Sequence, residues 1–96
     1  MQIALVVGSA VSTIKDEKLH GCKLLLVRQT DATGEPIGPS TIAIDTVSAG
    51  TGDLVIVTQG SSARLTSQTQ NAPVDMVIVG VIDSLEVGGR LSYRSQ

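Results

Sequence analysis

The sequence predicts a small all-β protein, a barrel or a closed sandwich of five or six strands. Its apolar residues come in short blocks rich in Val and Ile, which is typical of strands. Glycine and proline punctuate the stretches between the blocks, as they do in turns. A chain of 96 residues forms one hydrophobic core, so we expect a single domain over residues 1–96.

The predicted elements follow in chain order. Apolar blocks at residues 3–14, 22–29, 41–45, 53–58, 74–87 and 90–93 are the expected strands. Residues 31–40 and 48–53 are expected turns, and Gly88–Gly89 predicts a hairpin between the last two strands. One short helix is expected in residues 61–70, with Ser61 or Ser62 as its N-cap.

The expected strands are apolar on both faces. In residues 74–83, strict alternation would put Val77, Val79 and Val81 opposite Met76 and Ile78. The interior of one small barrel cannot hide both faces, so the pattern predicts self-association. The alternative is that loops or the short helix cover the second face within the chain.

Composition and charge argue against several partners and locations. Seven basic and nine acidic residues give a net charge of −2, with no basic cluster for nucleic acid or acidic membranes. One tyrosine, with no Phe or Trp, leaves little on which a single-stranded nucleic acid could stack. Cys22 cannot form an internal disulfide, no cleavable apolar leader is expected before the start of the sequence, and no apolar run approaches the length of a membrane span. A soluble, cytosolic protein is expected.

No stretch assembles a catalytic or metal site. Residues 49–53 contain G-x-G without a following helix, and Ser12–Lys15 fits S-x-x-K without its companion motifs. Ser61 and Ser62 lack the G-x-S-x-G spacing, and the chain has one histidine. His20 with Cys22 supplies two of about four ligands that a zinc site needs. We therefore expect no enzyme activity, no metal and no cofactor.

Four separated motifs, in order, resemble the EutN/CcmL family of bacterial microcompartment vertex proteins. They are "ALVVGSAVSTIKDEKLHGCKLLLV", "IAIDTVSAGTGD", "GSSAR" and "PVDMVIVGVIDSLEVGGRLSY", which together cover almost the whole chain. The departures are small. Ser48 stands where glycine is commoner, and Cys22 falls at a variable position.

The resemblance implies a five-stranded OB-like β-barrel with one short helix, assembled as a cyclic pentamer at the corners of a polyhedral shell. The implied partners are copies of itself and hexameric shell proteins, and the implied location is a microcompartment shell in the bacterial cytoplasm. The alternative is an OB-like ligand- or nucleic-acid-binding module without a shell role.

The motifs also suggest which residues meet at the subunit boundary, with Arg64 donating to a carboxylate or carbonyl of the neighbour. The expected family-motif and interface residues are Gly60, Ser61, Ser62, Ala63, Arg64, Pro73, Val74, Asp75, Val77, Val79 and Val81. For an axial pore the expected lining is Ser61 and Ser62, with the loop of Gly50, Thr51 and Gly52 as the rival.

Overall fold

A computed structural model describes residues 1–11, 22–60 and 75–95. All of its regular elements are strands: β1 (Gln2–Ala10), β2 (Lys23–Thr30), β3 (Pro36–Asp45), β4 (Leu54–Gln59), β5 (Met76–Val81), β6 (Ser84–Val87) and β7 (Arg90–Arg94). The predicted helix at 61–70 lies outside the described residues. The described part contains no helix long and apolar enough to cross a membrane.

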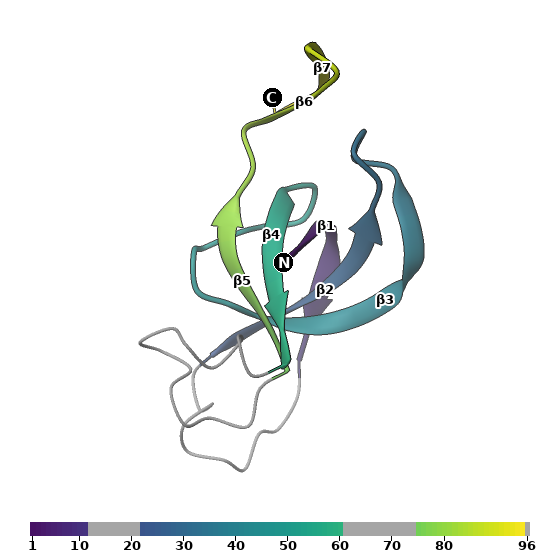
Figure 1. The fold of residues 1–96 in the computed structure, drawn as a ribbon. Coiled ribbons are helices and arrows are strands. Elements are labelled where there is room, and N and C mark those ends of the chain that lie inside the picture. Colours follow the sequence, from purple (N-terminus) through teal and green to yellow (C-terminus); the bar gives the residue numbers. More distant parts are fainter. Residues whose placement is uncertain (12–21, 61–74, 96) are drawn as a thin grey trace.

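Five strands close into a barrel in the order β1-β2-β3-β5-β4, with β4 pairing back to β1 (Figure 1). Neighbouring strands are antiparallel except β3 and β5, which run parallel over Ile44–Asp45 and Val77–Ile78. Closure leaves few unpaired strand edges. The predicted all-β, five-stranded barrel is confirmed.

The barrel interior is filled by small and medium apolar side chains from all five strands. Alternate residues point inward along the first half of β1 and along parts of β2 and β4, which is why Ala4, Leu25 and Val57 are almost fully buried. The core cluster comprises Ala4, Val6, Leu25, Val27, Ala43, Ala49, Val55, Val57 and Ile78. Burial of these residues supplies the main driving force for folding.

The third strand begins earlier than the sequence predicted. Residues 31–40 were expected as one turn because of their glycines and prolines, but β3 already begins at Pro36 and contains Pro39. Its parallel pairing with β5 starts only at Ile44, so the first half of β3 has no β5 partner. Proline, which lacks an N–H donor, is tolerated at such an unpaired edge.

The prediction of strict alternation through residues 74–83 was wrong. The register of β4 with β5 shifts between Val57↔Ile78 and Ile56↔Gly80. Ile78 points into the core, whereas Gly80 pairs with the outward-facing Ile56. The extra residue, Val79, therefore reverses the faces beyond it, as a β-bulge does. The strand is also interrupted at Ile82–Asp83, so the single strand predicted over residues 74–87 is two strands, β5 and β6.

The predicted Gly88–Gly89 hairpin is confirmed, and it forms a separate two-stranded sheet of β6 and β7 beyond the barrel (Figure 1). Both glycines have positive φ, 60° and 79°, as the favoured two-residue hairpin turn requires. The hairpin is tied to the β2–β3 turn, because the Ser92 hydroxyl donates to the Ala32 carbonyl at 2.7 Å.

Candidate functional site

The predicted interface residues of β5 differ in how accessible they are. Val77 is fully buried and packs with Ile44 in a second apolar cluster on the outside of the barrel. Val79 lies at the margin of this cluster, while Val81 is 41% exposed. In the described residues the second apolar face is thus partly covered within the chain, and Val79 retains surface for a neighbour. Val81 lies beyond the bulge and pairs with the core residue Val55, so it does not share this face.

Two of the predicted interface residues, Gly60 and Asp75, lie side by side in the structure. The N–H of Gly60, which has a φ of 63°, donates to the carbonyl of Asp75 at 2.9 Å. Both residues are exposed. Six other predicted site residues lie outside the described residues: Ser61, Ser62, Ala63, Arg64, Pro73 and Val74. Their placement at an interface or pore stays a prediction.

The rival pore loop, Gly50 to Gly52, is held in one conformation by hydrogen bonds. The Asp53 carboxylate accepts the Gly50 N–H at 2.8 Å, and the Gly52 N–H donates to the Val6 carbonyl at 2.8 Å. Thr51 and Gly52 are exposed at the tip. This loop therefore presents the exposed Thr51 side chain on an anchored backbone, and its place in an axial pore stays a prediction.

A carboxylate and an ammonium group anchor the start of the same loop. The side chain of Asp45 is buried and accepts the Val47 N–H at 3.0 Å. Lys23 lies 3.8 Å from it and donates to the Ala49 carbonyl at 2.9 Å. A buried carboxylate needs such partners. Asp45 therefore has a structural role in this loop.

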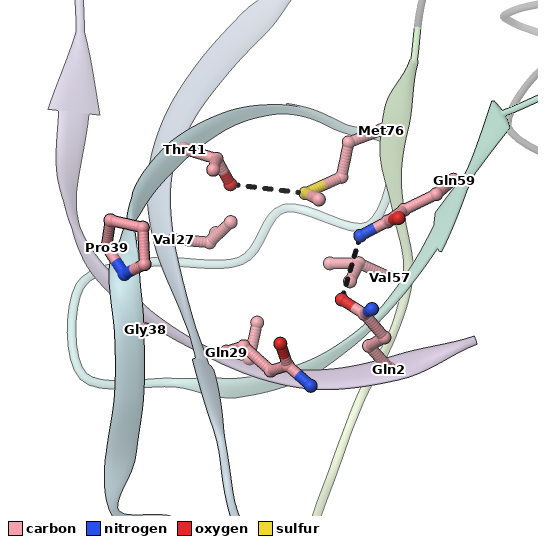
Figure 2. A pocket seen from close by; sticks show the side chains of 10 residues that line it. Gln2, Val27, Gln29, Gly38, Pro39, Thr41, Val57, Gln59 and Met76 are labelled. Atoms are coloured by element: carbon pink, nitrogen blue, oxygen red, sulfur yellow. Dashed lines mark hydrogen bonds between the residues drawn. The ribbon is translucent and has the colours of Figure 1, made fainter.

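A pocket of about 190 Å³ opens beside the unpaired half of β3 (Figure 2). Its floor is apolar, formed by Ala4, Val27 and Val57 of the barrel core. Polar amides surround it, and the Gln59 amide donates to the Gln2 side-chain oxygen at 2.8 Å. The full lining is Gln2, Ala4, Val27, Gln29, Gly38, Pro39, Thr41, Val57, Gln59 and Met76.

The pocket is lined by neutral groups, so it offers a small uncharged molecule or side chain apolar contact and amide hydrogen bonds. Its lining contains no acid or base that could activate the Thr41 hydroxyl. Sequence reasoning missed it. The available signal was that Gln2, Gln29 and Gln59 each stand at an end of an apolar block. What brings the three together is the barrel closure, which local patterns do not reveal.

The carboxyl of Asp31 lies in the β2–β3 turn and is surrounded by hydrogen-bond donors. Asp31 accepts hydrogen bonds from the Thr33 hydroxyl at 2.6 Å, the Thr33 N–H at 2.8 Å and the Glu35 N–H at 3.1 Å. These donors hold the pKa of Asp31 below its usual value. No three His, Cys, Asp or Glu side chains gather into a candidate metal site within residues 1–11, 22–60 and 75–95.

Comparison with known proteins places the chain in a family. Residues 1–83 match the family described as "Ethanolamine utilisation protein EutN/carboxysome". The chain belongs to the EutN/CcmL family. The resemblance seen in the four motifs is thereby confirmed.

Members of the EutN/CcmL family resemble this chain over nearly its whole length. The microcompartment shell vertex protein EutN of Salmonella typhimurium is 39% identical over 98% of this chain and 95% of its own. The carboxysome shell vertex protein CcmL of Synechocystis is 40% identical over 100% of this chain and 96% of its own length. The solved structure of the pentameric microcompartment shell protein GrpN of Rhodospirillum rubrum gives a TM-score of 0.81 at 41% identity, covering 91% and 99% of the two chains.

Proposed function

We propose that this chain is a structural shell protein of a bacterial microcompartment and that it forms cyclic pentamers at the vertices of the shell. The observation that carries this proposal is its similarity to the pentameric GrpN, together with relatives named as shell vertex proteins. The barrel supports the same role, because its outer surface keeps an exposed apolar residue, Ile42, at 55%.

Geometry explains why such a shell needs a protein of this kind. Hexagonal tiles alone make a flat sheet, and pentagons at the corners introduce the curvature that closes it. The chain then resides in the shell of a compartment within the bacterial cytoplasm. Its function is mechanical, and it is not an enzyme.

Hexameric shell proteins are the proposed partners of the pentamer. Their edges must match the sides of the pentamer in shape and charge. The geometry of a closed shell, in which every pentagon is surrounded by hexagons, supports this partnership. The assembled protein should retain purified hexameric shell protein in a pull-down at moderate salt, and a monomeric variant should not.

Native mass spectrometry of the purified chain, with light scattering over a dilution series, tests the pentamer. The expected species has five times the 9.9 kDa mass of one chain. A stable monomer at every concentration would refute self-assembly of the chain alone. Salt-sensitive binding of an oligonucleotide by that monomer would instead favour the alternative of an OB-like binding module.

A further inference from the structure

Two rows of apolar residues cross the outer surface of the barrel. The first, which we call the β2 row, consists of Gly8, Leu26 and Ile42, which are register partners on β1, β2 and β3. Leu26 faces outward because its neighbours Leu25 and Val27 lie in the core. Ile42, at 55% exposed, projects from the end of this row.

The second row, which we call the β4 row, consists of Ile3, Ile56 and Gly80 on β1, β4 and β5. Ile56 faces outward because Val55 and Val57 are core residues. Gly80 leaves this row flat at one end. Both rows start on β1 and extend from it in opposite directions around the barrel, the β2 row over β2 and β3 and the β4 row over β4 and β5 (Figure 1).

Each row ends in a glycine that the chain itself does not require. Neither Gly8 nor Gly80 has positive φ. A Cβ added at Gly8 would lie 3.7 Å from Leu26 Cδ1, and one added at Gly80 would lie 3.7 Å from Ile56 Cδ1, both ordinary contacts. Both glycines border a bulge, but a bulge demands glycine only where φ is positive. Glycine inside a strand otherwise marks a place where another backbone or side chain approaches closely.

The charges near the two rows differ. Arg28 follows Leu26 by two residues on β2 and therefore shares its outward face, whereas Lys23 is paired with Asp45. On the other side, β4 and β5 contain no charged residue, but aspartates flank them in the chain at Asp53, Asp75 and Asp83. Such complementarity steers one face toward the other and disfavours pairing of like faces.

We propose that the β2 row of one subunit packs against the β4 row of the next, with Ile42 seated on the flat surface at Gly80. This inference rests on the proposed pentamer. A ring requires two different, mutually complementary patches on every subunit. The two rows supply such patches, because the Ile42 side chain projects from the β2 row and Gly80, which has no side chain, leaves room for it on the β4 row.

Cysteine cross-linking of Ile42→Cys/Gly80→Cys tests the contact directly. If Ile42 sits on Gly80 of the neighbour, the two Cα atoms fall within disulfide range, which ends near 7 Å. Oxidation should then join subunits covalently, and a denaturing gel should show a ladder ending at five chains. Either single variant reports any background from Cys22. The matched control Ile37→Cys/Gly80→Cys uses another exposed isoleucine of β3, outside both rows, and should give no ladder.

A second variant separates this proposal from the pentamer itself. Ile42→Asp alters a mostly exposed residue, so the chain should keep its circular dichroism spectrum, yet its native mass should fall to one subunit; Ile37→Asp should remain pentameric. A parent that is not pentameric refutes the proposed function. A pentameric parent that gives no ladder, or an Ile42→Asp variant that stays pentameric, overturns the pairing of the rows and leaves the pentamer standing.

Discussion

Individual residues in the turns of this chain adopt conformations that the fold requires, and two of them give sharp predictions. Asp31 organises the β2–β3 turn by accepting three hydrogen bonds. Ser48 has a φ of 61°, a conformation that favours glycine. Neither residue is catalytic. Asp31 stabilises its turn through side-chain hydrogen bonds, whereas Ser48 supplies a left-handed backbone conformation.

Removing the Thr33 hydroxyl should raise the pKa of Asp31. That hydroxyl is the main cause of the lowered value, so Thr33→Val should move the pKa back toward the usual range, as an NMR titration of the Asp31 carboxyl would show. Thr33→Ser keeps the hydroxyl and is the control. Because the folded-state pKa is lowered, the contribution of Asp31 to stability is present above the ordinary pKa and is lost as the pH falls through the lowered one. An unchanged pKa in Thr33→Val would contradict this account.

Ser48→Gly should stabilise the chain. The left-handed conformation costs a non-glycine residue about 1–2 kcal/mol, and glycine removes this cost. Glycine also makes the unfolded chain more flexible, which lowers the stability of the folded state by roughly 0.5–1 kcal/mol. A net gain of about 0.5–1 kcal/mol follows from that difference, and urea unfolding would measure it. Ser40→Gly, in an extended strand, should instead lose stability. A destabilised Ser48→Gly would mean that the Ser48 side chain makes a contact worth more than the strain.

At the scale of the element, the β6–β7 hairpin stands out because isolated two-stranded hairpins are marginally stable in water. It depends on its attachment to the β2–β3 turn. Gly34 makes this possible, since a Cβ there would lie 3.2 Å from the ring of Tyr93. The φ of Gly34, 89°, also excludes most other residues.

Gly34→Ala should displace the hairpin from the turn. Tyr93 is the only aromatic residue of the chain, so its fluorescence and its quenching by acrylamide report on the hairpin alone. We expect stronger quenching in Gly34→Ala. Gly52→Ala is a matched control, because Gly52 has a similar φ of 94° but open space around its Cβ position. Equal quenching in the two variants would show that backbone strain, and not the contact with Tyr93, is what matters.

For the whole molecule, assembly and stability should be linked. The chain is small and depends on one barrel core, and it leaves apolar side chains such as Ile42 exposed. Association of folded subunits stabilises the folded state by mass action.

The thermal midpoint should therefore rise with protein concentration. Scanning calorimetry over about a hundredfold concentration range would measure this shift, which mass action predicts for any ring formed by folded chains. Ile42→Asp provides the comparison, since a monomeric variant should unfold at a midpoint independent of concentration. A constant midpoint for the parent would contradict a reversible pentamer.

The sequence by itself determined the all-β class, the Gly88–Gly89 hairpin, the shortage of chemistry-bearing residues and the family. These features follow from composition and from patterns a few residues long. Only the tertiary structure decided which residues face outward, because each bulge shifts the alternation by one and reverses a face. It also decided the pocket and the two rows, since both join residues from strands that meet only when the barrel closes.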